Sequence, residues 1–537
     1  MSRAFKTYLL GCSCLSALAV AAGATPATAQ QAVLPQGGQF TAGAGQVSQS
    51  GNAMLITQTT DRAVMSWQDF SISAQGQVHF SNGSGATLNR VTGQHVSQID
   101  GALSATGSLY LLNPNGVIVG SGGTIATGGD FVASTLDADI NAFMSDGTLD
   151  LEGVSQASVV NLGRIAASGG DILLAAHHVR NEGQVSASGE AALVAGHSVT
   201  LRDTGGDARI KVRTGLSGNV TNAGLVEGAR ATLEAAGGNI YALAGNTDGV
   251  ARGHVVARDG GRIRLAAADA VEITGTLTAD NASAQRAGRG GRIDVTGDTV
   301  SLGNTARLSA NGRADGGDIH VGGGWQGSDP ALRNASVTAI AAGAELTADG
   351  ETGDGGTVVA WSDGVTVFEG GISARGAQHG DGGTGAGGKV EVSGKQHLAF
   401  RGNVNTGGGT LLLDPTDIEI VDSITGTQIS AVDAGGDKLM VQALAQDSSQ
   451  VLASDLEALL QSNNVVITTQ NANGNGDGDI TVSAAIEKTG GAGGTALTMS
   501  AERNITVNAR IGSDDAARPL SVGLSAANDV TVNAAVE

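Results

Sequence analysis

The feature that most constrains the fold of this chain is an internal repeat of about 20 residues. Residues 161–179 align with residues 181–199 at a constant offset, and a third copy begins at Asn222. A single copy cannot bury its apolar face, whereas stacked copies can, because each strand then pairs with its equivalent one coil away. The repeat therefore predicts an all-β solenoid, a parallel β-helix with coils about 4.8 Å apart.

The alignment also predicts which side chains lie inside the solenoid. The matched apolar pairs are Ile165 with Val185, Leu173 with Leu193, and Val179 with Val199. We expect Val179 and Val199 to point inward on adjacent coils, and Leu193 to lie in the core. The residues that open the three copies are expected to form a ladder of stacked amides; they are Asn161, Asn181 and Asn222.

Two further blocks extend the pattern beyond the repeats of residues 151–286. Residues 287–420 contain Gly-Gly turns that each lead into a short strand, which is typical of a Gly-rich β-helix stalk. Residues 421–537 carry strands at a regular spacing of about 25 residues, beginning at Asp479, Asn504 and Asp529. Because Glu537 directly follows a repeat strand, we expect this last block to be incomplete.

One helix is predicted in the mature chain, near residue 454. Ser454 and Glu457 have the spacing of a capping box, in which each side chain bonds to the backbone N–H of the other. The helix is expected to run through Leu460. Strands and turns are expected elsewhere.

Composition narrows the class of protein. The chain has 85 Gly and only 3% aromatic residues, too few aromatics for an ordinary globular domain of this length, but 41% hydrophobic residues suffice for a thin core of Val, Ile and Leu. The formal charge is 30 − 51 = −21. Such acidity argues against a nucleic acid or an anionic membrane as the partner.

Residues 1–29 have the pattern of a signal peptide. A short basic region precedes an apolar stretch at residues 8–22, and residues 27–29 fit a small-x-small cleavage site. Cleavage is predicted between Ala29 and Gln30. The apolar stretch is shorter than the roughly 20 residues of a membrane span, so we expect no membrane-spanning segment in the mature chain.

No catalytic, cofactor or metal site is predicted. Both cysteines, Cys12 and Cys14, lie in the signal peptide. Acidic residues beside Gly, such as Asp354, could bind Ca²⁺ or form a carboxylate cluster, but turns require the same residue types, and we favour turn chemistry. His177 and His197 share a repeat position and could begin a metal site. No third ligand is evident, so a simple side-chain ladder is favoured, and we predict that the protein is not an enzyme.

The most specific motif is a tight turn at Asn113, Pro114, Asn115 and Gly116, between two strand-like segments. Pro114 pre-sets one turn dihedral, and Asn115 and Gly116 tolerate positive φ. Together with residues 88–91 and 97–103, this turn resembles the amino-terminal secretion domain of the two-partner-secreted filamentous haemagglutinins. The absence of the related motif Asn-Pro-Asn-Leu favours the branch related to high-molecular-weight adhesins. Residues 353–420 resemble the stalk of large exoproteins of this family.

The resemblance implies a right-handed β-helix with an N-terminal secretion-domain cap, the domain covering residues 30–150. It implies a partner, an outer-membrane transporter barrel, and a route through the periplasm to the outside or the surface of a Gram-negative cell. Asn113, Pro114, Asn115 and Gly116 would form the secretion motif, either as a recognition element or as a structural turn. Receptors on host or bacterial cells are further candidate partners.

Three function classes follow from the sequence. The first is a secreted or surface-exposed adhesin of the filamentous haemagglutinin type. The second is the carrier stalk of a contact-dependent toxin whose effector lies beyond residue 537. The third is a β-helix enzyme acting on polysaccharide, which would need aromatic sugar platforms in one groove, whereas Trp67, Trp325 and Trp361 are widely spaced.

Overall fold

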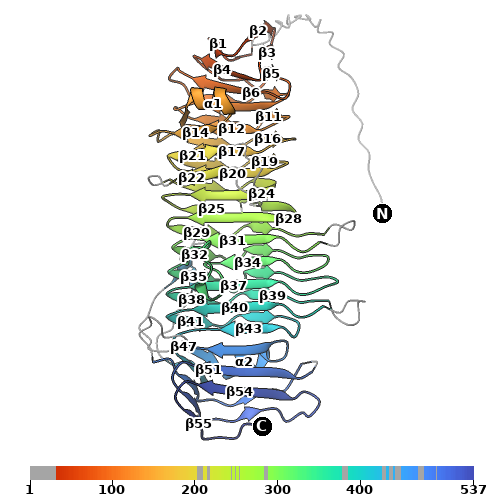
Figure 1. Ribbon diagram of the computed structural model, residues 1–537, viewed down its shortest axis with the longest axis vertical. Coiled ribbons are helices and arrows are strands. Elements are labelled where there is room, and N and C mark those ends of the chain that lie inside the picture. The colour runs from red at the N-terminus through yellow and green to blue at the C-terminus, as the bar shows by residue number, and fades with distance from the viewer. Residues whose placement is uncertain are drawn as a thin grey trace, which may run out of the picture. The chain divides into compact units, whose positions relative to one another are not determined.

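The computed structural model describes most of the chain after the predicted signal peptide. The described residues are 32–201, 210–213, 218–242, 245–247, 250–252, 254–282, 288–377, 385–425, 431–433, 439–441, 449–469, 477–491 and 493–537. The predicted cleavage site at Ala29 and Gln30 lies outside them. Residues 32–537 form one unit, in which the chain winds as a right-handed parallel β-helix with its coils stacked along one axis (Figure 1). The predicted fold class is confirmed.

Three parallel ladders form the faces of the β-helix. The first consists of β3 (Ala53–Gln58), β5 (Gln77–Ser81), β8 (Ala102–Ala105), β11 (Thr124–Thr127), β16 (Arg164–Ala167), β19 (Gln184–Ala187), β24 (Leu225–Ala235), β28 (His254–Ala267), β30 (Thr276–Thr278), β33 (Arg307–Ser309), β36 (Glu345–Thr347), β39 (Gly371–Ser373) and β42 (Asn403–Asn405).

The second ladder shares the long strands β24 and β28 with the first. Its other members are β4 (Arg62–Trp67), β6 (Ala86–Val91), β9 (Ser108–Leu112), β12 (Phe131–Ser134), β17 (Ile172–Ala176), β20 (Glu190–Ala195), β31 (Arg292–Thr296), β34 (Asp318–Val321), β37 (Thr357–Ser362), β40 (Lys389–Gly394), β43 (Thr410–Leu413), β48 (Asn464–Thr468), β51 (Thr495–Ala501) and β54 (Leu520–Ala526).

The third ladder completes the coils. It consists of β7 (Ser97–Ile99), β10 (Val117–Val119), β15 (Ser158–Asn161), β18 (His178–Asn181), β23 (Val220–Asn222), β25 (Ile240–Ala242), β29 (Ala270–Ile273), β32 (Thr299–Leu302), β35 (Val337–Ile340), β38 (Val365–Phe368) and β41 (His397–Phe400). Further along the chain, a five-stranded parallel sheet contains β44 (Ile418–Val421), β47 (Ser449–Leu452), β49 (Ile480–Val482), β52 (Ile505–Val507) and β55 (Val530–Val532). β50 (Ile486–Glu487) pairs with β53 (Ile511–Gly512).

The first described strands cover the beginning of the column. β1 (Gln39–Ala42) pairs antiparallel with β4, and β2 (Gly45–Ser50) pairs antiparallel with β3. An open β-helix end would leave a row of backbone groups unpaired. These antiparallel strands therefore form the N-terminal cap that the resemblance implied.

The core runs through the column as a single apolar cluster of mostly aliphatic side chains. Ile165 and Val185 lie in register on adjacent coils, as predicted. Leu193 is fully buried, but its partner is Leu174, whereas Leu173 pairs with Ala192. The predicted match of Leu173 with Leu193 is wrong by one residue. Since side chains alternate between the two faces of a strand, that shift turns Leu173 out of the column.

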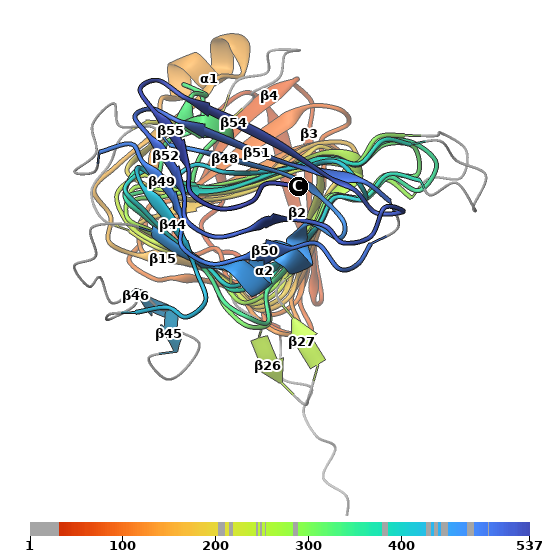
Figure 2. The same ribbon diagram turned by 90° about the horizontal axis from the view of Figure 1, so that it is seen from below.

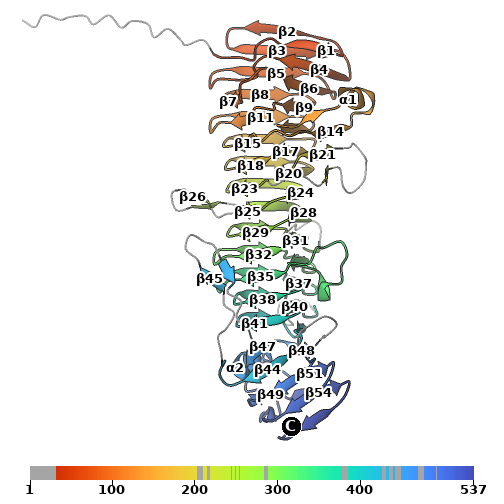
Figure 3. The same ribbon diagram turned by 90° about the vertical axis from the view of Figure 1, so that its left-hand side faces the viewer.

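A second apolar cluster lies outside the second ladder. It is covered by β13 (Asp137–Ala138), α1 (Ile140–Asp146), β14 (Leu149–Glu152) and the hairpin of β21 (Ser198–Leu201) and β22 (Ile210–Arg213), shown with α1 at one side of the column in Figure 3. Val199 belongs to this cluster and pairs with Leu151, whereas Val179 pairs with Val220 in the column. Both valines are buried, but the prediction that they stack on adjacent coils is wrong, because the chain leaves the column after β20.

Coil length varies more than the repeats predicted. Arg164 pairs with Gln184, but Gln184 pairs in turn with Leu225, so the second of these coils is far longer than the first. The additional residues form excursions outside the core, such as the β21–β22 hairpin and the hairpin of β26 (Gly245–Thr247) and β27 (Val250–Arg252). β45 (Ala431–Asp433) and β46 (Leu439–Val441) form another. The regular repeat seen in the sequence therefore holds only for the shortest coils.

Two α-helices occur among the described residues. The predicted helix is present as α2 (Ala453–Leu459), but its N-cap is Leu452 and no side chain caps it; Glu457 Oε1 accepts instead from the N–H of Glu487 at 2.7 Å. The predicted capping box is therefore wrong. The other helix, α1, was not predicted, although Asp139 caps its N-terminus and Gly147 ends it with φ 83°. Neither helix is long enough to span a membrane.

Candidate functional site

The turn at residues 113–116 joins β9 to β10 at a corner of the column. The N–H of Gly116 donates to the Asn113 carbonyl at 3.0 Å, which closes the turn. Gly116 has φ 119°, a conformation that L side chains rarely adopt. A glycine is therefore required here, and the corner can lead straight from the second ladder into the third.

The side chain of Asn113 connects this turn to the preceding coil. It is fully buried, and its Nδ2 donates to the His95 carbonyl at 2.9 Å and to Ser97 Oγ at 3.0 Å. Its Oδ1 accepts from the backbone N–H and from Nδ2 of Asn115, at 2.9 and 3.0 Å. A buried amide with all its groups paired is costly to replace, because any shorter side chain leaves these partners unsatisfied.

Asn115 and Pro114 connect the turn in two further directions. Asn115 Nδ2 donates to the Gly93 carbonyl at 2.9 Å, on the preceding coil. Ser155 Oγ, from the segment that enters the next coil, donates to the Pro114 carbonyl at 2.6 Å. Pro114 is itself exposed and Asn115 is half-buried. The turn thus binds three successive passes of the chain together and exposes little of itself.

Several residues of this network were not predicted. Ser97 lies at the start of a segment that carried the resemblance. His95 and Gly93 contribute only backbone carbonyls, and Ser155 comes from a distant segment, so no motif marks them. The neighbouring segment at residues 88–91 has a packing role: Asn89 is buried and its Oδ1 accepts from Trp67 Nε1 at 2.9 Å. The segments that carried the resemblance therefore each place a buried asparagine that hydrogen-bonds to other parts of the column.

The predicted amide ladder is also present. Asn161 Nδ2 donates to Asn181 Oδ1 at 2.8 Å, and Asn181 Nδ2 donates to Asn222 Oδ1 at 2.7 Å. All three are fully buried in the third ladder. Like Asn113, each of these buried amides hydrogen-bonds to a neighbouring coil, but here the same bond recurs from coil to coil.

The two repeat-related histidines lie together as expected. The ring centroids of His177 and His197 are 5.4 Å apart, and His178 lies 4.3 Å from His177. His197 Nδ1 donates to the Gly153 carbonyl at 2.7 Å. Burial, and then the neighbouring imidazoles, lower the pKa of His177. No group of three or more metal-ligating side chains was found among the described residues, and the ladder interpretation stays a prediction.

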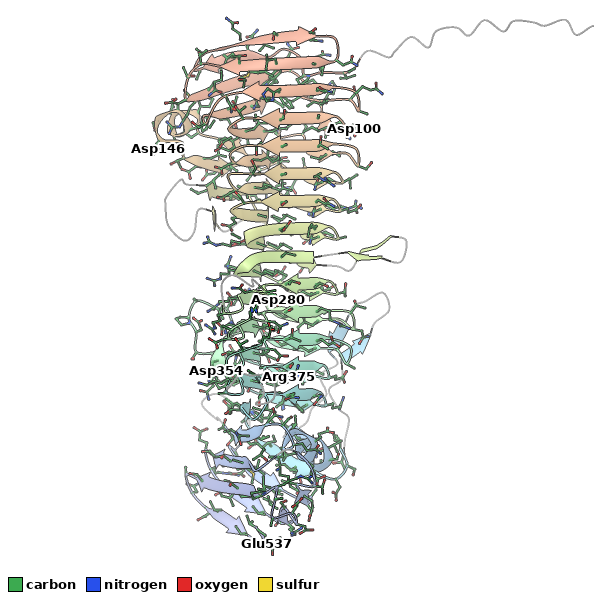
Figure 4. The ribbon with its side chains drawn as sticks, turned by 90° about the vertical axis from the view of Figure 1, so that its right-hand side faces the viewer. Asp100, Asp146, Asp280, Asp354, Arg375 and Glu537 are labelled. Carbon is green, nitrogen blue, oxygen red and sulfur yellow. The ribbon has the colours of Figure 1, made fainter. Side chains whose placement is uncertain are left out.

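Acidic residues of the Gly-rich coils serve the corners. Asp315 Oδ1 accepts from the N–H of Asp354 at 2.8 Å, and Asp354 Oδ1 accepts from the N–H of Ala386 at 2.7 Å. Asp280 and Asp349 make equivalent bonds to Asn311 and Arg375, each one coil further along the chain. Figure 4 shows Asp280, Asp354 and Arg375 on these coils, whose loops project together to one side of the column in Figure 2. Each carboxylate bridges to the backbone of the next coil.

A groove of about 380 Å³ lies along these corners. Its lining includes Asp280, Arg313, Asp349, Glu351 and Arg375. Asp349 and Arg375 pair with each other at 2.8 Å, so these two charges are balanced within the groove. Asp381, another acidic residue of this block, lies outside the described residues.

Comparison with known families identifies a domain in the N-terminal part of this column. Residues 31–285 match the family model of the TPS secretion domain. A TPS secretion domain in this part of the chain indicates a two-partner-secreted exoprotein, consistent with the filamentous haemagglutinin family. Such a domain implies an outer-membrane transporter as its partner, and proteins that carry it are exported to the outside or the cell surface.

Particular relatives refine the class. The chain is 31% identical over 245 residues to a heme/hemopexin-binding protein of Haemophilus influenzae strain Rd, covering 43% of this chain and 27% of that protein. A second heme/hemopexin-binding protein of Haemophilus influenzae is 41% identical over 88 residues, 16% of this chain and 9% of that protein. The chain therefore spans about a quarter, or less, of the length of these curated relatives.

A solved structure supports the same assignment. The HMW1 secretion domain from Haemophilus influenzae superposes with a TM-score of 0.60 and 27% sequence identity, covering 69% of this chain and 98% of that one. The predicted resemblance is thereby confirmed. The family match continues to residue 285, well past residue 150, where the sequence placed the end of the domain; that internal boundary stays a prediction.

Proposed function

We propose that the protein is a filamentous haemagglutinin-like adhesin that its N-terminal domain exports. The observation that carries the proposal is the continuity of the column: one apolar core runs from the matched secretion domain into the Gly-rich coils. A rigid stalk built directly on an export domain suits a molecule that presents a surface away from the cell. The curated relatives are named for binding, which favours a binding protein over an enzyme.

The proposed export begins with the signal peptide, which takes the chain to the periplasm. The outer-membrane barrel then recognises the unfolded N-terminal segment, and the chain passes outward. The cap and first coils fold outside, and each coil offers a strand edge on which the next can pair. Burial of apolar side chains outside makes return unfavourable, so folding could drive transport without a nucleotide.

Within this scheme, we assign Asn113, Pro114, Asn115 and Gly116 a structural role. Their polar groups are used almost entirely within the column, by bonds to His95, Ser97 and neighbouring backbone. A recognition element would need to keep such groups available to the transporter. The turn would therefore act by allowing the first coils to close.

The experiment measures secretion in cells that carry the partner barrel. Deletion of residues 32–150 should abolish secretion, and normal secretion of that variant would overturn the proposal. Asn115→Ala separates the two roles of the turn, with Asn181→Ala as the matched control, a buried amide of the later ladder. A structural role predicts that secretion and stability fall together in both variants. Loss of secretion in Asn115→Ala at unchanged stability would instead establish recognition.

Two alternatives remain for the role of the stalk. A toxin carrier would share the whole described column, and only an effector domain carried with the chain would distinguish it from an adhesin. A polysaccharide-active β-helix is the second alternative. The groove along Asp280, Asp349 and Arg375 is where its activity would be sought, by assaying the purified chain against acidic and neutral polysaccharides. Binding of cells by the purified chain, without polysaccharide cleavage, is expected.

A further inference from the structure

The excursion between β34 and β35, residues 322–336, lies across the outer face of the second ladder, beside β37 (Figure 3). It contains the short 3₁₀ helix η1 (Trp325–Gly327) and Gln326, the single non-glycine residue among those described that has a positive φ, 50°. An added Cβ at Gly327 would lie 2.7 Å from the Trp361 indole. The positive φ of Gln326 is strained and persists only where the surrounding structure holds it.

Two buried carboxylates on successive coils hold Gln326. Its backbone N–H donates to Glu391 Oε2 at 2.8 Å, and its side-chain amide lies 3.5 Å from Asp414 Oδ2. Glu391 in β40 is 0% exposed, and Asp414, which follows β43, is 1% exposed. Both carboxylates therefore converge on one residue of the excursion, beneath its strained turn.

The described side chains leave this pair of acids incompletely compensated. Glu391 Oε1 is buried and has no hydrogen-bond partner. Burial raises the pKa of Glu391 to about 8, and Asp414 adds to the rise, although the N–H of Gln326 and the Ser393 hydroxyl oppose it. Burial likewise raises the pKa of Asp414; Glu502 adds to that rise, while Thr468, Gln326 and Lys395 oppose it. A carboxylate buried this deeply, with no ion-pair partner, requires a proton or a cation to compensate its charge.

We propose that Glu391 and Asp414 bind a divalent cation of the Ca²⁺ class, which fastens the excursion to the second ladder. The oxygens that could bind the cation are the unpartnered Oε1 of Glu391, the Asp414 carboxylate, whose Oδ1 accepts from Thr468 at 2.6 Å, and the Ser393 hydroxyl, which interacts with Glu391. Rotation of the Gln326 amide would add its oxygen, since the two ends of an amide are assigned from their contacts. Ca²⁺ accepts six to eight oxygens in irregular geometry, whereas Mg²⁺ requires a strict octahedron and gives up water reluctantly.

The acidic corners of the Gly-rich coils offer a contrast within the same chain. Asp315 and Asp354 already accept backbone N–H groups and are exposed or half-buried. Their carboxylates are satisfied and solvated, so they gain little from a cation. A cation effect should therefore depend on Glu391 and be indifferent to Asp354.

Tryptophan emission reports on the site directly. The chain has 3 Trp, of which Trp325 belongs to η1 and Trp361 packs against Gly327. Titration of the full mature chain with Ca²⁺ should change tryptophan emission saturably and raise the melting temperature by about 2 °C or more. Tb³⁺, which occupies Ca²⁺ sites, should show luminescence sensitised by these indoles and be displaced by excess Ca²⁺.

Variants decide the assignment. Glu391→Gln keeps the shape of the buried side chain and should abolish the Ca²⁺ and Tb³⁺ responses; Asp414→Asn should weaken them at least tenfold. Asp354→Asn, the control, should leave both unchanged. Circular dichroism verifies that each variant is folded. The proposal is overturned if Ca²⁺ leaves emission unchanged in the wild-type chain while pH alone alters it, or if Glu391→Gln retains the full response.

Discussion

The turn at residues 113–116 and the Gly-rich corners around Asp315 and Asp354 perform the same task, turning the chain between faces of one column, by different means. In the first, the buried amide of Asn113 and the half-buried amide of Asn115 donate to the preceding coil, and Ser155 of the following segment donates to the turn. In the second, one carboxylate accepts one backbone N–H from the next coil, and the arrangement repeats. The turn of the secretion domain is thus held by one dense hydrogen-bond network, whereas each corner of the stalk is held by one hydrogen bond of a repeated kind. We expect the loss of any single stalk bond to cost little stability.

The largest expected effect tests whether the two regions share one core. Leu193→Asp, in the secretion domain, and Ile319→Asp, in the stalk, each place an unpaired charge at a fully buried position. Each should cost about 4 kcal/mol or more in the free energy of unfolding. Urea denaturation followed by circular dichroism measures both. A much smaller cost at either position would show that the core is not equally packed along the column.

Asn113→Ala should have the next largest effect. It removes an amide with four hydrogen bonds inside the fold and leaves buried partners unsatisfied, so a loss of about 3 kcal/mol is expected. Hydrogen exchange should place the loss in the coils around residues 93–116. A loss below about 1 kcal/mol would show that the Asn113 network contributes no more stability than a single corner hydrogen bond of the stalk.

The stability of the two regions should depend differently on pH. Asp294 in β31 is 1% exposed and accepts from His320, Arg262 and Arg292. Burial alone would raise its pKa, but these groups outweigh burial and lower the pKa to about 2. A depressed pKa contributes stability that is complete above the ordinary value of 3.8 and is lost as pH falls towards 2.

The expected size of that contribution is about 2 kcal/mol. As the pH falls from 4 to 2, an acid-active protease should therefore cleave the stalk around β31 increasingly fast. Asp294→Asn should remove this dependence of cleavage on pH. The amide ladder of Asn161, Asn181 and Asn222 does not titrate, so its own hydrogen bonds should add no pH dependence to their coils. Equal acid sensitivity at both places would contradict the comparison.

The smallest effect is expected at the stalk corners. Asp354→Asn keeps an oxygen that can accept from Ala386, and the site is exposed, so the change in stability should be below about 0.5 kcal/mol. Asp354→Ala, which removes the acceptor, should cost about 1 kcal/mol. Thermal unfolding of the two variants side by side measures the contribution of one repeated tie.

Sequence alone predicted the regular part of this molecule. The amide ladder and the match of Ile165 with Val185 follow from identical or similar residues at a fixed offset, because stacking places equivalents together. Leu173 was misplaced because β17 pairs with β20 one position out of step with the neighbouring ladder, which sets Leu173 opposite Ala192. Val199 was misplaced because an excursion does not repeat and so leaves no periodic trace.

The candidate sites divide in the same way. Asn113 and Gly116 were found because a tight turn has its own residue chemistry. The partners of that turn, such as His95 and Ser155, lie on other coils, and Glu391 and Asp414 lie still further along the chain from Gln326. Only the lengths of the intervening coils bring such residues together, and those lengths vary from one coil to the next.

The parallel ladders have a mechanical consequence. Their hydrogen bonds point along the axis of the column, so a pull between its two ends loads successive coils in series, not in parallel. The weakest coil yields first and releases its own residues, on the order of 3.3–3.6 Å each, while its neighbours keep their pairing. Under tension such a column lengthens in steps, one coil at a time. The force at which it begins to unfold is set by its least stable coil.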